Sequence, residues 1–403
     1  MVGIKRQHQA GGNGVVDDVD VGVGRVMVRD PRRYQPDSVL TFMRSPRTSR
    51  SPVRKRLDYI DVLRGVGLLC MVVDHAYDWW LVEAANRGPW GRATEFIGTL
   101  AAPIFLVLVG VSMVLATDSR RTQGALDRQL VWRFIQRGLM IALWGYVVNL
   151  SVFFNGDNWR DVFAFDVLQC IGLGIVLFAP VAVWAPTWAL LPLALVLGWG
   201  GQYAEWLMLP GYLGTVVNGS PDIAYFPLLP WLCYIPAGIL WGWGLLRWRD
   251  NVRELDRLVL ALVPIGLVLL VASAFVPPTL GYRHPWAAFI LFSFSIVAWL
   301  AVGLYVWCRV AGGRLGRFLG WLRDTGCETL MLYILHHLIG FRLLYWLGGV
   351  TGRSWRGQYG AFTIPQATAL LVTLLGVMVV VTRAWSRWKA KPGVWQHGAR
   401  IFL

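Results

Sequence analysis

Runs of about 20 apolar residues dominate this sequence and leave few folds open to it. An α-helix rises about 1.5 Å per residue, so each run is long enough to cross the ~30 Å hydrocarbon core of a bilayer. Hydrophobic residues make up 56% of the chain and charged residues 15%, against about 25% charged residues in soluble proteins. The sequence therefore predicts an integral membrane protein that crosses the bilayer several times.

Ten apolar spans follow one another along the chain. They lie near 59–82, 96–116, 133–154, 163–183, 187–203, 226–246, 257–276, 287–308, 327–347 and 366–383. The fifth span is the least regular, because it contains Pro192 and several glycines, and a re-entrant segment is an alternative there. We predict an all-α fold, a polytopic transmembrane bundle of about ten helices.

The positive charges alternate between the two sides of this predicted bundle. Of the 38 Lys and Arg residues, 30 fall in the two tails and in every second loop, and only 7 fall in the opposite loops. Cytoplasmic loops carry the excess of Lys and Arg, so both termini are predicted to be cytoplasmic. The net charge of +15 is spread over these loops, which argues against a nucleic-acid partner.

The composition divides the chain into three parts. Residues 1–56 form a basic N-terminal tail that we expect to be disordered, residues 57–385 form the transmembrane domain, and residues 386–403 form a cytoplasmic C-terminal tail. Translation from Met43 is an alternative that would shorten the first tail. The five cysteines form no C-x-x-C pair, so neither a zinc site nor a disulfide framework is indicated.

The first span is unusually polar. It carries Asp61, Arg64, Asp74, His75 and Asp78, and an ionisable group in the membrane costs roughly 2.5–3.5 kcal/mol on insertion scales. Arg64 and His75 lie about 20° apart around a helix axis and about 16 Å apart along it. One interpretation is an interfacial ion pair of Asp61 with Arg64 and a histidine that only bonds neighbouring helices. The other is a general base, His75, whose imidazole is tuned by Asp74 and Asp78.

Other polar residues within the spans admit structural and functional interpretations alike. The fourth span holds Asp166 and Gln169, the sixth begins near Trp231, and the ninth holds Tyr333 and His336. Helix packing and interfacial anchoring explain such residues without any chemistry. No H-x-x-x-H or related spacing occurs, so we expect no metal site.

Several motifs resemble those of the transmembrane acyltransferases, including the Arg-x10-His group and, more closely, the heparan-α-glucosaminide N-acetyltransferase catalytic-domain family. The motifs are Asp61-x-x-Arg64-Gly65, Asp74-His75, Pro103-x-Phe105, Gly110-x-Ser112, Val167-Leu-Gln-Cys-Ile-Gly172, Phe226-Pro-Leu-Leu-Pro-Trp231 and the segment from Gly326 to His336. They are spread over residues 57–340, nearly the whole membrane region. Segment 83–95, where lysosomal members carry the critical histidine, has none here, and His75 has the Arg-x10-His placement instead.

The resemblance implies transfer of an acetyl or other short acyl group from cytoplasmic acetyl-CoA, or another acyl-CoA, to a sugar amine or hydroxyl on the extracytoplasmic side. In that scheme His75, with Asp74 and Asp78, is the base or the transient acyl carrier. The donor-binding residues would be Arg64, Asp61 and Gln169. The residues implied to line the substrate cavity are Asp166, Tyr333, His336 and Trp231.

Two other classes of protein fit the same polar stripe. A transporter or flippase for a glycan or lipid-linked substrate would use it as a proton or anion path, and a structural membrane subunit would use it for helix packing. The lipid bilayer is the one partner that every interpretation requires, and a homodimer is an assembly that the sequence leaves open. Without long extracytoplasmic domains or paired cysteines, we expect the bacterial plasma membrane.

Overall fold

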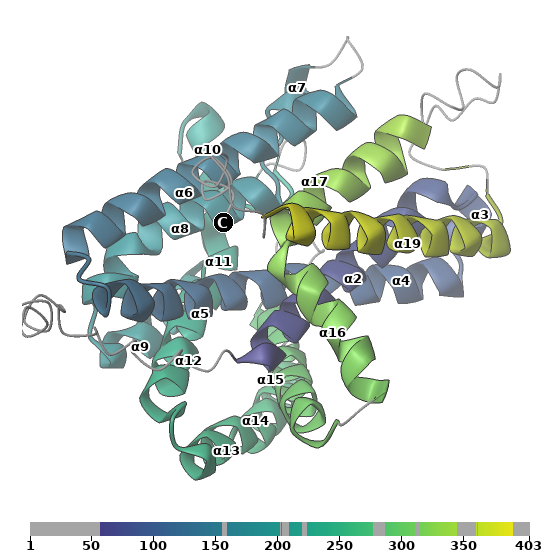
Figure 1. The fold of residues 1–403 in the computed structure, drawn as a ribbon. Coiled ribbons are helices and arrows are strands. Elements are labelled where there is room, and N and C mark those ends of the chain that lie inside the picture. Colours follow the sequence, from purple (N-terminus) through teal and green to yellow (C-terminus); the bar gives the residue numbers. More distant parts are fainter. Residues whose placement is uncertain are drawn as a thin grey trace, which may run out of the picture. The chain divides into compact units, whose positions relative to one another are not determined.

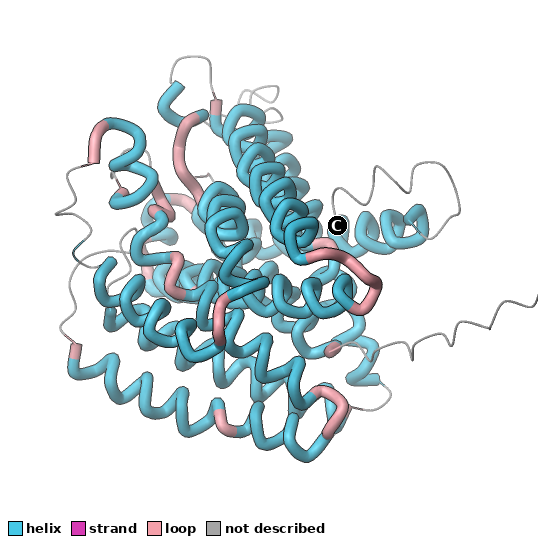
Figure 2. Tube along the Cα trace, turned by 90° about the vertical axis from the view of Figure 1, so that its left-hand side faces the viewer, coloured by secondary structure: helices cyan, strands magenta, loops and turns pink. Residues whose placement is uncertain are grey.

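The computed structural model describes residues 57–154, 159–201, 203, 209–219, 224–276, 287–311, 314–344, 360 and 362–389. Within these residues the regular secondary structure is helical, and only two isolated β-bridges interrupt it (Figures 1 and 2). The tail predicted at 1–56, with the alternative start at Met43, lies outside the described residues. So does most of the tail predicted at 386–403, because the last helix continues to Lys389.

The first half of the bundle runs from α2 to α10. Its elements are α2 (Asp58–Trp80), α3 (Glu83–Asn86), α4 (Pro89–Thr99), α5 (Ala101–Arg121), α6 (Asp127–Val148), the π-helix η2 (Asn149–Phe153), α7 (Trp159–Val162), α8 (Val167–Trp184), α9 (Thr187–Gly200) and α10 (Gly211–Asn218).

The second half runs from α11 to α19. Its elements are α11 (Leu228–Trp231), α12 (Tyr234–Trp248), α13 (Val252–Leu260), α14 (Leu262–Phe275), α15 (Ala287–Val310), α16 (Arg314–Cys327), α17 (Thr329–His337), the π-helix η4 (Leu338–Leu343) and α19 (Ile364–Lys389). Helix α16 occupies a segment that the sequence analysis had treated as a loop.

Six helical segments of the described chain are long and apolar enough to cross a membrane. They are Pro89–Arg121, Val167–Trp184, Leu228–Trp248, Val252–Phe275, Ala287–Val310 and Ile364–Lys389. Two more predicted spans coincide with the shorter apolar helices Thr187–Gly200 and Thr329–Leu343. The other two coincide with α2 and α6, which are long enough but more charged. The multi-pass helical membrane fold is confirmed, and the count of ten and the cytoplasmic termini stay predictions.

Helix α2, the most polar of the predicted spans, lies among other helices. It contacts α4, α5, α15, α16, α17 and α19, which surround it in the bundle (Figure 1). A helix with this many ionisable groups cannot face lipid tails, because each charged side chain would lose its hydration without gaining a partner. Packing inside the bundle gives those groups protein partners, and this places α2 where a site can form.

Helices α2 and α16 approach each other closely at two glycines. A Cβ atom on Gly326 would lie 1.9 Å from the backbone oxygen of Asp61, and one on Gly65 would lie 2.1 Å from that of Leu322. Small residues let helix backbones meet in this way inside a membrane. Gly110 and Gly238 form a similar close contact between α5 and α12. Gly138 and Gly172 do the same between α6 and α8.

Backbone and indole hydrogen bonds fix the C-terminal end of α2. The amide of Val82 donates to the carbonyl of Phe362 at 3.0 Å, and the amide of Phe362 donates to that of Trp80 at 2.9 Å. The indole of Trp80 also donates to the carbonyl of Gly340 in η4 at 2.8 Å. These bonds join α2 to the start of α19 and to η4, so the side chains on the last turns of α2 are held against α17 and its π-helical continuation.

A substitution at Gly326 tests the close contact of α2 with α16. We expect Gly326→Ala to lower the free energy of unfolding by about 1–3 kcal/mol, because a methyl group there overlaps the α2 backbone. Gly320→Ala is the matched control on the same helix, since nothing lies within 4 Å of a Cβ at that position. Thermal unfolding of both variants in detergent measures the difference. Equal stability of the two variants would contradict the described packing.

Candidate functional site

Three histidines from two helices meet near the end of α2. Helix α2 supplies His75, and α17 supplies the adjacent pair His336 and His337. Each histidine offers one ring nitrogen, and these three nitrogens all lie within 4.8 Å of one another. The shortest contact joins Nδ1 of His75 to Nε2 of His336 at 3.1 Å. His336 and His337 are each 1% exposed, whereas His75 is only partly buried, so His75 is the member that is most open to a substrate.

Backbone carbonyls of α17 determine where the hydrogen atoms of this cluster lie. Nδ1 of His336 is 3.1 Å from the carbonyl of Leu332, and Nδ1 of His337 is 2.9 Å from that of Tyr333. A carbonyl oxygen only accepts, so both Nδ1 atoms carry hydrogen and both neutral rings keep a lone pair on Nε2. Nε2 of His336 then accepts from Nδ1 of His75. The remaining nitrogen of His75, Nε2, therefore has a lone pair.

Aromatic rings hold the imidazoles in place. Trp79 stacks on His75, with ring centroids 4.9 Å apart and an angle of 26° between the planes. Trp79 also lies nearly parallel to His336, and Tyr333 packs against His337 with centroids 4.6 Å apart. Immediately after the two histidines α17 continues as the π-helix η4, a local distortion that is frequent at functional sites. These aromatic contacts orient the three imidazoles toward one another.

Asp74 and Asp78 were predicted to tune the imidazole of His75, but the hydrogen-bond partner of its Nδ1 is His336. Asp74 lies against α4, where a Cβ on Gly98 would be 2.2 Å from its carboxyl carbon. Asp78 is exposed and accepts a hydrogen bond of 3.2 Å from the side chain of Asn86. A catalytic role for these two carboxylates remains a prediction.

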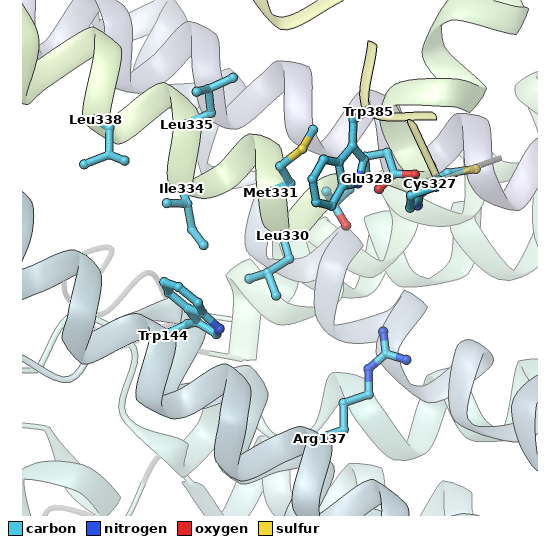
Figure 3. A pocket seen from close by; sticks show the side chains of 12 residues that line it. Arg137, Trp144, Cys327, Glu328, Leu330, Met331, Ile334, Leu335, Leu338 and Trp385 are labelled. Carbon is cyan, nitrogen blue, oxygen red and sulfur yellow. Dashed lines mark hydrogen bonds and ion pairs between the residues drawn. The ribbon is translucent and has the colours of Figure 1, made fainter. Parts of the chain in front are cut away.

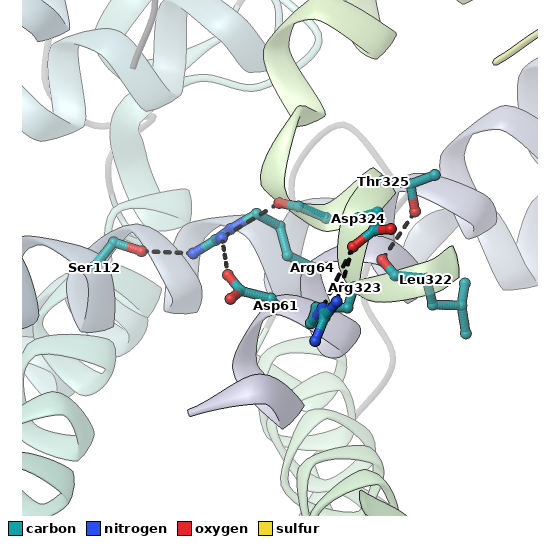
Figure 4. Close-up of polar contacts among 8 residues, drawn as sticks. Asp61, Arg64, Ser112, Leu322, Arg323, Asp324 and Thr325 are labelled. Carbon is teal, nitrogen blue, oxygen red and sulfur yellow. Dashed lines mark hydrogen bonds and ion pairs between the residues drawn. The ribbon is translucent and has the colours of Figure 1, made fainter. Parts of the chain in front are cut away.

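Arg64 and Asp61 form the ion pair that one interpretation of the sequence predicted. A guanidinium nitrogen of Arg64 lies 2.8 Å from the carboxylate of Asp61 and also donates to the carbonyl of Gly326 at 3.3 Å. A second nitrogen donates to the hydroxyl of Ser112 at 2.9 Å (Figure 4). One side chain thus joins α2 to α5 and α16, in a part of the bundle where each charge needs a partner.

Asp166 and Gln169 cap a helix, and Trp231 lies in the hydrophobic core. Asp166 caps α8 by accepting from the amide of Val167 at 2.7 Å, and Gln169 reaches back to the amide of Asp166 at 3.3 Å. Such a reciprocal pair is a capping box, which satisfies backbone donors at a helix start. Trp231 is fully buried and packs on Phe226.

A cavity of about 300 Å³ lies between α6, α17 and α19. Its walls are mostly apolar, and its lining residues on α17 and η4 include Met331, Ile334 and Leu338 but no histidine (Figure 3). Two cations border it: Arg137 near the middle of α6 and Lys389 at the end of α19, where Lys389 pairs with Glu328. An apolar space with basic residues at its border suits a ligand that has an anionic end and an uncharged arm.

Sequence reasoning did not assign a role to Arg137, Lys389 or His337. Arg137 was counted with the preceding loop, although α6 begins at Asp127 and places it about 15 Å into the helix. A cation so far inside an apolar span is the feature that identifies it. The involvement of His337 follows only from the contact of α17 with α2, which the sequence does not contain.

A scan against protein-family models matches residues 56–271 to the family described as heparan-alpha-glucosaminide N-acetyltransferase, catalytic. The match covers more than half of the chain. The chain belongs to this family. The predicted resemblance is thereby confirmed, and so is the assignment to the multi-pass membrane transferases. A search of curated proteins found no match.

The N-acetyltransferase family match includes one part of the histidine cluster and leaves out the other. His75, with the Asp61 and Arg64 pair, lies inside the matched residues, and His336 and His337 lie beyond their end. The structure nevertheless brings α17 against α2. The family assignment and the cluster geometry are therefore two separate observations, and His75 is the member of the cluster that lies within the matched residues.

Proposed function

We propose that this membrane acyltransferase moves an acetyl or other short acyl group from cytoplasmic acyl-CoA to a sugar amine or hydroxyl on the other side of the membrane. The observation that carries the proposal is the lone pair on Nε2 of His75, left there by the hydrogen bond of its Nδ1 to His336. In an N-acetyltransferase family member, such a nitrogen is the group that can accept a proton from the acceptor.

The hydrogen-bond network supports an acyl transfer in which His75 passes one proton from the acceptor to the thiolate of CoA. Nε2 of His75 takes the proton of the acceptor N–H or O–H while the freed electron pair attacks the thioester carbonyl. The new C–N or C–O bond forms as the C–S bond breaks, and the thiolate of CoA takes up the proton from the imidazolium. His336 acts as a positioning residue, because its Nε2 keeps accepting from Nδ1 of His75 while that ring is positive. In the alternative in which His75 carries the acyl group transiently, the same Nε2 lone pair attacks the thioester carbonyl.

The cavity between α6, α17 and α19 supports binding of the donor. Its apolar walls suit the arm and acyl group of an acyl-CoA, and Arg137 suits its phosphates, whereas the charge of Lys389 is paired with Glu328. The cavity extends along α17 from Glu328, and about 12 Å of helix separates that residue from His336. Arg64 makes hydrogen bonds within the bundle, so we propose that it orders helices α2, α5 and α16.

Removal of His75 tests the assignment of the base. We expect His75→Ala in liposomes to transfer acetyl groups from labelled acetyl-CoA to an amino sugar at least about 100-fold more slowly than wild type. His336→Ala should also be slow, and His336→Gln should recover part of the loss because its amide oxygen can accept from His75. His8→Ala is the control, since that histidine belongs to the N-terminal tail. Full activity of His75→Ala would contradict the assignment, and glycan transport without transfer would favour a transporter.

A substitution at Arg137 tests the donor cavity. We expect Arg137→Ala to raise the KM for acyl-CoA about tenfold with a smaller effect on kcat, because a hydrogen bond to a charged group contributes about 1.5–3 kcal/mol. Arg133→Ala is the matched control one turn away on α6, because Arg133 does not line the cavity. Steady-state kinetics at varied acyl-CoA concentration separate the two. An unchanged KM for Arg137→Ala would place the donor elsewhere.

A further inference from the structure

We propose that His75, His336 and His337 form a binding site for a divalent transition-metal ion of the Zn²⁺ type, and that occupancy of the site switches acyl transfer off. The distances between the ring nitrogens are close to those of a metal site. Ligand nitrogens at about 2.0–2.1 Å from a tetrahedral Zn²⁺ lie about 3.3 Å from one another. The pair formed by His75 and His336 is at 3.1 Å, and the widest ligand pair is within 4.8 Å. A ring shift of roughly 1–1.5 Å closes the triangle.

The two histidines of α17 are oriented as metal ligands usually are. A histidine that binds a metal almost always donates its other ring N–H to a carbonyl, carboxylate or water. His336 and His337 both do this, to the carbonyls of Leu332 and Tyr333. Both rings therefore already have the tautomer in which Nε2 can bind a metal, and at His336 the metal would replace the hydrogen bond from Nδ1 of His75. Both rings are almost fully buried, so two of the three ligands are already held in place.

The type of metal follows from the donor atoms. The cluster offers three neutral imidazole nitrogens, a set that suits Zn²⁺, Cu²⁺ or Ni²⁺, whereas Mg²⁺ and Ca²⁺ prefer oxygen. Three protein ligands leave one position of a tetrahedron open to water. The prediction that no metal binds rested on the absence of an H-x-x-x-H or related spacing within one helix. An adjacent pair on α17 joined by a histidine of α2 escapes that criterion.

The effect on activity follows from counting lone pairs, and this step rests on the proposed function. A neutral imidazole has one lone pair. When His75 binds a metal through either nitrogen, that lone pair is used, and the other nitrogen carries hydrogen. His75 can then neither accept a proton from the sugar nor carry the acyl group. Metal binding and acyl transfer therefore exclude each other at this residue.

Metal binding is measured first, without any activity assay. Tag-free protein in detergent is dialysed against Zn²⁺ and analysed for metal, and Co²⁺ is added separately to look for the visible absorption of a tetrahedral complex. We expect one equivalent of Zn²⁺ in wild type and a loss of affinity of at least about 100-fold in His337→Asn. In that variant the Asn amide can still donate to the Tyr333 carbonyl, which preserves the fold. His8→Ala, the control for adventitious binding, should bind one equivalent.

Two results would overturn the metal site: substoichiometric Zn²⁺ in wild type, or unchanged affinity in His337→Asn. For regulation, Zn²⁺ should inhibit acyl transfer by wild type and EDTA should restore it. His337→Asn, compared with its own uninhibited rate, should need at least about tenfold more Zn²⁺. Transfer that persists with the site filled would refute the switch. Metal binding without any transfer activity would refute the proposed function and leave the site standing.

Discussion

The hydrogen bond from His75 to His336 is the contact on which the functional arrangement depends. It joins α2, the most polar helix, to α17, and it acts in a region that offers little competing water. Each ring there has one hydrogen and one lone pair, so fixing one ring fixes the next. The Leu332 carbonyl orients His336, His336 orients His75, and the lone pair that results on His75 is the only reactive feature that the chemistry needs.

The rest of the bundle can be understood as support for this contact. A polar helix such as α2 requires protein on all sides, and the close approach of α16 at Gly65 and Gly326 provides part of it. Arg64 then bonds to three different helices, including its own through Asp61. The bonds of Trp80 to Phe362 and Gly340 hold the end of α2 beside η4. Helix packing and the reactivity of His75 thus have the same cause: polar groups held away from water need hydrogen-bond partners within the protein.

Hydropathy was sufficient to predict where the apolar helices lie, because the thickness of the hydrocarbon core sets the length of both the apolar runs and the helices. The polarity of α2 identified His75 and Arg64 from the sequence alone. The partner of His75 could not be predicted, since nothing in the sequence states that α17 packs on α2. Asp166 and Gln169 were predicted beside the substrate, and they form a capping box whose three-residue spacing was visible in the sequence. For these two residues the capping-box spacing and the family resemblance indicated different roles.

The most direct test of this account is the position of the hydrogen on the His75 ring. Nitrogen-15 NMR of histidine-labelled, EDTA-treated protein distinguishes a protonated ring nitrogen from one with a lone pair, and His75→Ala identifies the resonances of that residue. The account predicts hydrogen on Nδ1 of all three clustered histidines and a lone pair on Nε2 of His75. A hydrogen found on Nε2 of neutral His75 would contradict it, because that ring would then have no lone pair to offer a substrate.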